Sequence, residues 1–449
     1  MSNDNKINSK FLQQISDLIA DCSNKNIQKL INELHVADIA EIINNLSEEE
    51  ANYLYQLIDE EKSALVLMEL EEDIREHLLS NLSSEEIATD VIKNLETDDA
   101  TDVILELPQE LKEEVLSLIE DDEHASDITD LLNYPEDTAG GLMAKELIKV
   151  NENWNTLQCL KEMRKQASSV KKVHTIYVVD DNDKLIGTLS LRKLLLSESK
   201  IFIKEIANTE IISVQVNEDD ASVANIMNKY DLIVIPVVNQ ENILMGRITI
   251  DDVMDVVKDE AEKDYQMASG ITEDVEATDS IWQLTRARLP WLIIGLAGGL
   301  LGAKVIGLFD IEENIQLAFF IPLIAAMGGN VGVQSAAIVV QGLANESIKL
   351  NTTVSKLTKE LGVALLNGLI CSLIIFGSTI ILQYSIQLSI TVSISLLSVI
   401  VFAALFGTFI PLTLERYKID PALATGPFIT TINDILGLYI YFLIGQSIL

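Results

Sequence analysis

Cysteine and histidine are scarce in this chain, which has 449 residues but only 3 cysteines and 4 histidines. Cys22, Cys159 and Cys371 lie far apart in the sequence and match neither a disulfide framework nor a zinc-binding spacing. The histidines are scattered and form no ligand cluster. The sequence therefore predicts a reduced compartment and argues against a metal site built from cysteine and histidine.

Basic residues are scarce in the first two-thirds of the chain. Residues 286–449 contain 8 basic and 8 acidic residues, so 24 of the 32 basic and 61 of the 69 acidic residues precede them. The whole net charge of −37 thus lies before residue 286. Binding to nucleic acid requires a basic surface, so no nucleic acid partner is predicted. An acidic region of this kind is either solvated or binds cations.

Two sequence signals are also missing. The N-terminal stretch MSNDNKINSKFLQQ lacks the basic and then apolar pattern of a signal peptide, which predicts a cytoplasmic location for the front part. No G-x-x-x-x-G-K-[S/T] phosphate loop occurs, so transport driven by ATP hydrolysis is not expected. The chain is interpreted as a protein that is not an enzyme.

Long hydrophobic runs, in contrast, are present after Arg288. A membrane-spanning helix needs about 20 apolar residues to cross a core of about 30 Å, and each run reaches that length. Five spans are predicted, at Leu289–Phe309, Ile315–Leu343, Leu361–Leu382, Ile390–Leu414 and Ala422–Leu449.

Basic residues in the loops predict the orientation of these spans in the cell membrane. Arg286 and Arg288 precede the first span, and further basic residues follow the second and fourth spans, whereas the loops after the first and third carry none. Because basic loops stay in the cytoplasm, the N-terminus is predicted inside and the C-terminus outside.

The second and fifth spans carry the polar residues of a transport pathway. Asp434 is the only formal charge after Asp420, and a carboxylate at membrane depth is a candidate functional group. Pro322, glycines, Asn330 and Gln334 predict that the second span is interrupted and lines a pore, although close helix packing would also explain the glycines. Oxygen ligands suit a hard cation such as Mg²⁺ or Ca²⁺. One carboxylate does not neutralise a divalent ion, so a symmetric dimer is expected.

The acidic front part predicts a helical domain followed by two β-rich repeats. Apolar residues recur at helical spacing between residues 27 and 132, in related units such as HVADIAEIINNL and SSEEIATDVIKNL. The β-rich units at 174–195 and 230–256 predict a tandem CBS pair. In CBS domains the residues at Thr249 and Asp252 can hold a nucleotide, so ATP or another adenosine nucleotide is a candidate ligand. The first repeat has Lys193 in place of the aspartate, and a purely structural pairing of the repeats is the alternative.

An acidic helix is predicted to connect these repeats to the membrane spans. Asp252, Asp255, Asp259 and Glu262 are 3, 4 and 3 residues apart, so their carboxylates share one face. Like charges at this spacing destabilise a helix by a few tenths of a kcal/mol per pair, roughly 0.2–0.5. A divalent cation between this face and another acidic one would reverse the effect, whereas a solvated linker is the alternative.

Several motifs in this order resemble the MgtE-type magnesium channel/transporter family. They are TAGGLM at Thr138–Met143 after the helical domain, the tandem CBS repeats, the acidic connector, PLIAAMGGNVGVQS and DPALATGPFITTINDILG. The resemblance runs from about residue 27 to the end. It implies a homodimer in the lipid membrane with a pore along the dimer axis and hydrated Mg²⁺ at Asp434. It also implies a connector, the "plug" helix, that closes the pore when cytosolic Mg²⁺ bridges it to the other cytoplasmic domains.

The resemblance also implies a set of cytosolic Mg²⁺ ligands by motif position. These are Asp98 and Asp102 in the helical domain, Asp219 and Asp231 in the CBS repeats, and Asp252, Asp255, Glu260 and Asp264 in the connector; Asp259 is added on spacing alone. The chain departs from the family pattern at Lys263, Val333, Ala337 and Gly426. These departures concern ion selectivity and some regulatory ligands.

The predicted fold class is a multidomain membrane protein. It comprises an all-α N-terminal domain (1–133), a tandem α/β CBS pair (134–200 and 201–257), a connecting plug helix (258–285) and a transmembrane domain of five α-helices (286–449). The predicted function is a Mg²⁺-selective, channel-like transporter closed by its own ion. Two alternatives are a CBS-regulated transporter for another cation or solute, and a membrane-anchored adenosine-nucleotide sensor.

Overall fold

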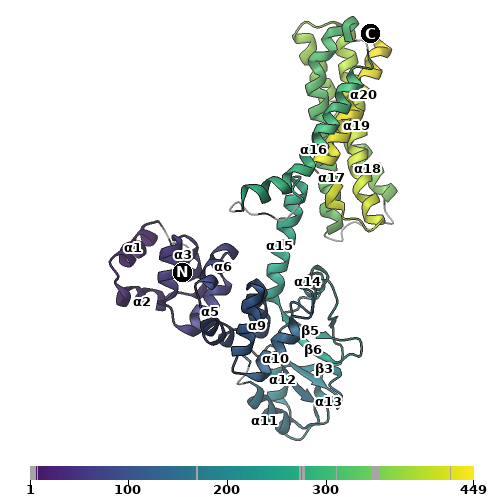
Figure 1. The fold of residues 1–449 in the computed structure, drawn as a ribbon. Coiled ribbons are helices and arrows are strands. Elements are labelled where there is room, and N and C mark those ends of the chain that lie inside the picture. Colours follow the sequence, from purple (N-terminus) through teal and green to yellow (C-terminus); the bar gives the residue numbers. More distant parts are fainter. Residues whose placement is uncertain are drawn as a thin grey trace. The chain divides into compact units, whose positions relative to one another are not determined.

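The computed structural model describes residues 7, 9–167, 170–272, 275, 279–309, 311–344, 353–424 and 426–449. The chain divides into two compact units, Met1–Val257 and Lys258–Leu449 (Figure 1). Each unit has its own buried core.

The first unit begins with short helices. Isoleucine and leucine side chains at helical spacing form one buried core, in which Ile39, Ile42 and Ile43 are fully buried. Serines begin helices where a glutamate follows three residues later, as at Ser47 and Ser83, because each pair satisfies backbone N–H groups at the helix start. The helices of this part are α1 (Ser9–Ala20), α2 (Asn24–Asn32), α3 (Val36–Asn44), α4 (Glu48–Tyr55), α5 (Glu60–Met68), α6 (Glu72–Ser80), α7 (Ser84–Glu86), α8 (Thr97–Glu106), α9 (Gln109–Leu118) and α10 (Asp122–Leu131), with a π-helical turn at Ile87–Val91 and a 3₁₀ turn at Ile92–Asn94.

Two small sheets with the same topology follow in the first unit. In each, the first strand pairs parallel with the second, and the second pairs antiparallel with the third. Both antiparallel pairs shift register at the same place, between Val178 and Val179 and between Val237 and Val238. The predicted repeat is therefore present as a structural repeat. Its elements are β1 (Ile148–Asn151), α11 (Thr156–Gln166), β2 (Ile176–Val179), β3 (Leu185–Leu189) and α12 (Leu191–Leu196), then α13 (Ile203–Ile206), β4 (Val214–Gln215), α14 (Asp220–Lys229), β5 (Val234–Val238) and β6 (Leu244–Thr249).

The acidic connector is one helix, α15 (Ile250–Ala268). It starts directly after β6 and ends at Ala268, and the next helix begins at Ile281. The connecting segment was predicted over 258–285, so its helix begins earlier and ends earlier than that segment.

Among its described residues, the second unit contains five helices that are long and apolar enough to cross a membrane. The helix α19 is the most buried of them, and it carries small polar side chains such as Ser389 and Thr391 in its buried positions. The elements are α16 (Ile281–Ile306), a 3₁₀ segment (Ile311–Phe320), α17 (Ile321–Ala344), α18 (Thr353–Ile381), α19 (Ile386–Arg416), a 3₁₀ turn (Pro421–Ala424) and α20 (Gly426–Ile448).

The interruption predicted within the second span is wrong. The helix α17 is continuous from Ile321 to Ala344, and Pro322 stands in its first turn, where a missing backbone N–H costs no hydrogen bond. In the fifth span, the break lies before the helix: α20 begins at Gly426, which has a φ of 49°, and Pro427 follows. The glycines of α17 are positions where neighbouring helices pack closely.

Candidate cation sites

The first unit contains a cavity lined by five carboxylates, which we call the acidic cavity. Three come from α8, one from the loop after α10 and one from the first turn of α15. They are Asp98, Asp99, Asp102, Glu136 and Asp252. The cavity has a volume of about 70 Å³, enough for a small ion with some of its water. Asp98, Asp102 and Asp252 were predicted from the sequence, and the structure brings these three together.

The TAGGLM motif places Glu136 beside the acidic cavity. A Cβ on Gly141 would lie 2.5 Å from the carbonyl oxygen of Pro135 and 2.8 Å from Cα of Glu136. A Cβ on Gly140 would lie 2.5 Å from Cδ1 of Tyr134. Only glycine allows the chain to fold back this closely on the preceding loop. The motif therefore has a direct structural role in forming the cavity wall.

The four aspartates of the acidic cavity have raised pKa values. Burial, reinforced by Asp99 and Asp252, raises the pKa of Asp98 well above its ordinary value. Burial and then Asp252 raise the pKa of Asp99 to about 6, and burial and then Asp99 raise the pKa of Asp102 to about 7. Burial also raises the pKa of Asp252. A proton or a cation in this cavity would relieve the repulsion among the carboxylates.

The two residues predicted to hold a nucleotide are bonded to each other. The Thr249 hydroxyl donates to Oδ2 of Asp252 at 2.6 Å, and the Thr249 backbone N–H donates to the same oxygen at 3.0 Å. Asp252 also lines the acidic cavity, where phosphate would meet four other carboxylates. In this arrangement the pair starts a helix and faces acidic groups.

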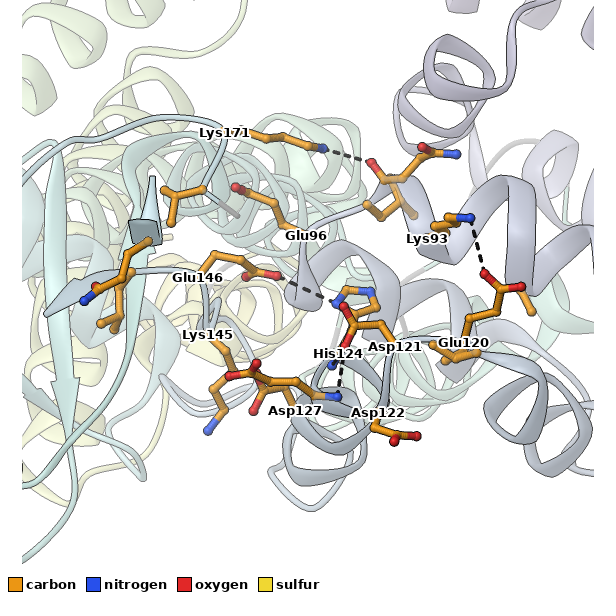
Figure 2. Close-up of a pocket in the computed structure, with 18 of the residues that line it drawn as sticks. Lys93, Glu96, Glu120, Asp121, Asp122, His124, Asp127, Lys145, Glu146 and Lys171 are labelled. Atoms are coloured by element: carbon orange, nitrogen blue, oxygen red, sulfur yellow. Dashed lines mark hydrogen bonds and ion pairs between the residues drawn. The ribbon is translucent and has the colours of Figure 1, made fainter. Parts of the chain in front are cut away.

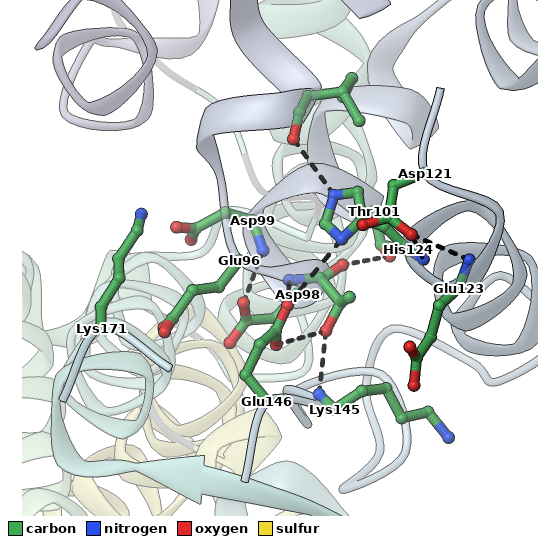
Figure 3. A network of polar contacts seen from close by, with 12 residues as sticks. Glu96, Asp98, Asp99, Thr101, Asp121, Glu123, His124, Lys145, Glu146 and Lys171 are labelled. Atoms are coloured by element: carbon green, nitrogen blue, oxygen red, sulfur yellow. Dashed lines mark hydrogen bonds and ion pairs between the residues drawn. The ribbon is translucent and has the colours of Figure 1, made fainter. Parts of the chain in front are cut away.

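A network of polar contacts lies beside the acidic cavity (Figure 3). The Glu146 carboxylate accepts hydrogen bonds from the backbone N–H of Thr97 at 3.0 Å and from the Thr97 hydroxyl at 2.8 Å. This places a negative charge at the start of α8, where the helix dipole favours it. We call the set Glu96, Thr97, Lys145, Glu146 and Arg247 the docking network.

Arg247 of β6 anchors the docking network. Its side chain is almost fully buried, and Nη2 lies 3.2 Å from both carboxylate oxygens of Glu96, while Nε donates to the carbonyl of Glu146 at 2.6 Å. Lys145 adds an ion pair of 2.6 Å with Asp130. The prediction from sequence missed this network, because its partners are 15 to 151 residues apart and carry no motif.

A larger cleft of about 1340 Å³ is lined in part by Glu96, Lys145 and Glu146 of the docking network (Figure 2). Acidic residues at the start of α10 line it together with lysines that are already paired, such as Lys93 with Glu120 and Lys171 with the carbonyl of Asn94. His124 lies between the carbonyl of Ile92 at 3.2 Å and Glu146 at 4.0 Å.

The remaining predicted cytosolic residues are spread out. Asp219 is exposed and caps the start of α14, where it accepts from the backbone N–H of Ser222. Asp231 is exposed beyond the other end of the same helix, with a φ of 50°. A helix of this length separates them by roughly 15 Å, so they do not form one site by themselves. Asp255 and Asp259 are exposed on α15.

Within the second unit, the far end of α15 approaches another acid. Burial, followed by the charge of Asp420, raises the pKa of Asp264. Glu260 forms an ion pair of 3.2 Å with Lys263, one of the departures from the family pattern. Across the residues that the structure describes, no group of three or more His, Cys, Asp or Glu side chains is close enough to hold a metal ion directly.

The membrane site lies where α17 and α20 meet. A Cβ on Gly329 would lie 3.5 Å from Cγ2 of Thr430 and 3.7 Å from Oδ1 of Asp434. Asp434 of α20 therefore lies beside Gly329 of α17, at ordinary contact distance from the position of a Cβ. Asn330, the next residue, is exposed in the chain, and so is Gln334 one turn later.

Asn433 is a polar residue at this contact that the prediction did not single out as a site residue. Its side chain is 1 % exposed, and neither amide atom has a hydrogen-bond partner among the described residues. A Cβ on Gly332 would overlap Nδ2 of Asn433, and a Cβ on Gly407 of α19 would overlap the carbonyl of Gly332. Glycines thus allow α17, α19 and α20 to pack at close range.

These features together define a multi-pass membrane protein with a cation-transport domain and a CBS regulatory pair. The model of a family described as divalent cation transporters, MgtE, matches residues 321–444. The MgtE intracellular N domain matches 34–137, and the CBS domain matches 139–199 and 203–259.

The chain belongs to the MgtE family of magnesium transporters. It is 34% identical over 319 residues to "Magnesium transporter MgtE" of Bacillus subtilis, covering 71% of each chain. It is also 34% identical over 327 residues to "Magnesium transporter MgtE" of Thermus thermophilus, covering 71% of this chain and 72% of that protein. A solved structure, the "cytosolic domain of the Mg2+ channel MgtE in complex with ATP", matches 55% of this chain and 99% of its own at 28% identity, with a TM-score of 0.51. The resemblance inferred from the sequence is confirmed.

Proposed function

We propose that this protein carries Mg²⁺ into the cytoplasm through a pore formed by two copies of the chain. The observation that supports this most strongly is the polar face of α17 beside Asp434. A membrane potential of 100 mV supplies about 2.3 kcal/mol per charge, hence about 4.6 kcal/mol for a divalent ion. Transport in this direction therefore requires no coupled hydrolysis.

The exposed residues of α17 argue for the second copy. Ala326, Asn330 and Gln334 are spaced by four residues and form one exposed stripe along the helix. Side-chain amides are poorly solvated by lipid, so this stripe faces water or protein. A two-fold axis parallel to the stripe places two copies of Asp434 around one pathway, and two carboxylates neutralise a divalent ion.

Asp434, Asn330 and Gln334 are the proposed pore residues. Their oxygen atoms suit Mg²⁺, which keeps several water ligands and is bound through few carboxylates. The proposed orientation has the N-terminus in the cytoplasm and the C-terminus outside, because the loops after the second and fourth spans carry the basic residues.

The acidic cavity is the proposed cytosolic Mg²⁺ sensor. Burial and mutual repulsion raise the pKa values of Asp98, Asp99 and Asp102, so a divalent cation binds there with relief of repulsion. Because Asp252 belongs to α15, Mg²⁺ in the cavity joins the helical domain to the connector helix. The other acids proposed to act with it in closing the pore are Asp219, Asp231, Asp255, Asp259, Glu260 and Asp264. The domain boundaries at residues 133, 200, 257 and 285 are part of the same proposal.

A nucleotide is proposed as a second cytosolic ligand. The related cytosolic domain was solved in complex with ATP, and the CBS pair of this chain has the same strand order in both repeats. For Thr249 and Asp252 to take part, the hydrogen bond between them has to open, because it occupies the hydroxyl and one carboxylate oxygen. ATP binding is therefore expected to depend on whether the acidic cavity is assembled.

The central test is Mg²⁺ uptake by liposomes containing the full chain, with Mg²⁺ on the cytosolic face varied. The Asp434→Asn variant should lose most uptake, whereas Glu415→Gln, at the end of α19, removes a carboxylate outside the proposed site and should leave uptake unchanged. Intact uptake and selectivity in Asp434→Asn would rule out the pore assignment.

Gating is tested by limited proteolysis of the connector. Millimolar Mg²⁺ should protect α15 from cleavage in the wild type, and this protection should be weaker in Asp102→Asn. Equal cleavage of the wild type with Mg²⁺ and with chelator would contradict the sensor.

A further inference from the structure

A second carboxylate lies inside a candidate membrane span. Glu360 belongs to α18, seven residues after the helix begins, and the span covers Val354–Ile381. The predicted third span began at Leu361, one residue later, so the sequence alone left Glu360 in the preceding loop. An ionised side chain within a span is costly and is found where it has a specific partner.

The partner of Glu360 is the pore-lining helix α17. The hydroxyl of Ser335 donates to Oε1 of Glu360 at 2.6 Å, and Ser335 is 4 % exposed. A hydrogen bond to a charged acceptor at this length is stronger than a neutral one. Ser335 directly follows Gln334, which lies on the exposed stripe of α17. Glu360 therefore bonds a buried residue of α17 that lies next to Gln334 on the exposed stripe.

The glycines of α17 lie at its close contacts with the neighbouring helices. Gly328, Gly329 and Gly332 face α19 and α20, where they present backbone rather than interlocking side chains. Such surfaces allow close approach, and Ile324 of the same helix is fully buried in the core of the bundle. A rotation of α17 by one residue, about 100°, would replace Asn330 by Val331 on the exposed stripe. The directional bond between Ser335 and Glu360 adds to this packing in opposing such a rotation.

We propose that Glu360 is a positioning residue for transport: through Ser335 it fixes the rotation of α17 so that Asn330 and Gln334 face the ion pathway. This inference rests on the proposed function of α17. Glu360 acts here as a hydrogen-bond acceptor and not as an ion ligand. A glutamine at this position retains an acceptor oxygen, whereas leucine does not.

The test compares Glu360→Gln, Glu360→Leu and Ser335→Ala in full-length protein in liposomes. The readout is the ratio of Mg²⁺ to Ca²⁺ uptake, which reports how the pathway residues are arranged. Glu360→Gln should keep the wild-type ratio within about threefold, and Glu360→Leu and Ser335→Ala should each lower it about tenfold, the scale of one charge-assisted hydrogen bond. The double variant Ser335→Ala/Glu360→Leu should be no worse than either single variant.

The matched control is Ser378→Ala on the same helix. The Ser378 hydroxyl bonds the carbonyl of Ile374 within α18, so its loss should not change the uptake ratio. If Glu360→Leu fails to fold, as judged by size-exclusion chromatography in detergent, Ser335→Ala and Glu360→Gln still carry the test.

Two results overturn the proposal. If Glu360→Gln loses selectivity as much as Glu360→Leu, the negative charge itself is required. If Ser335→Ala keeps the wild-type ratio, the bond does not position α17. Failure of the proposed function would give a different result from failure of this proposal. The wild type would then take up no Mg²⁺, or Asp434→Asn would transport normally.

Discussion

Gly332→Ala tests whether the glycines of α17 serve as a close-packed contact beside the pore. A Cβ at this position would overlap Nδ2 of Asn433 and lie 2.7 Å from Cγ2 of Ile429. Asn433 and Ile429 are both almost fully buried, so neither side chain has room to move aside. The two helices α17 and α20 have to separate, and Asp434 moves away from Gly329.

The size of the effect follows from comparison with Gly362→Ala on α18, where a Cβ would meet nothing within 4 Å. Both variants gain the helix propensity of alanine, about 1 kcal/mol. Only Gly332→Ala is destabilised by overpacking, typically by about 1–3 kcal/mol. At about 2–4 °C per kcal/mol for a unit of this size, Gly332→Ala should unfold about 2–12 °C below Gly362→Ala.

The assay is thermal unfolding of both purified variants in the same detergent, followed by Mg²⁺ uptake in liposomes. Gly362→Ala should unfold about 2–4 °C above the wild type and transport like it, whereas Gly332→Ala should unfold earlier than Gly362→Ala and transport less. Equal stability and equal uptake in the two variants would refute the contact between α17 and α20.

Three further predictions concern the cytosolic unit. First, the raised pKa values of Asp99 (about 6) and Asp102 (about 7) mean that the folded state binds more protons than the unfolded state between about pH 4 and 7. Stability without Mg²⁺ should therefore be full below pH 4 and fall as the pH rises to 7; urea unfolding of Asp102→Asn should show a smaller fall, and a rise in stability over this range in the wild type would contradict the assignment. Second, Glu96→Gln removes the charged partner of buried Arg247 and should cost up to about 3 kcal/mol in the same measurement. Glu120→Gln, which breaks the exposed pair with Lys93, should cost less than about 1 kcal/mol, and equal losses would argue against the docking network. Third, Gly141→Ala should displace Glu136 and weaken Mg²⁺ protection of α15 against protease, whereas undiminished protection would exclude Glu136 from the sensor.

The sequence alone was enough to predict the class of protein and the order of its parts. The membrane spans can be predicted because a run of about 20 apolar residues is a local property of the sequence and does not depend on tertiary contacts. The repeated strands and the helical domain are visible for the same reason, since their periodicities of 2 and 3.6 residues are set by the backbone. Asp434 and the connector acids could be chosen because a charge in an apolar span, or four acids on one helical face, is unusual by itself.

Tertiary structure decided which of these residues meet and what the glycines do. The acidic cavity includes Asp99 and Glu136, which the prediction omitted, because cavity walls form from segments that chain folding brings together. Arg247 forms an ion pair with Glu96, 151 residues away in the sequence, and Ser335 donates a hydrogen bond to Glu360, 25 residues away. The glycines of α17 were predicted to interrupt a helix, but glycine is compatible both with a break and with close packing. Which of the two occurs depends on whether neighbouring helices press against it, and only the packed bundle determines that.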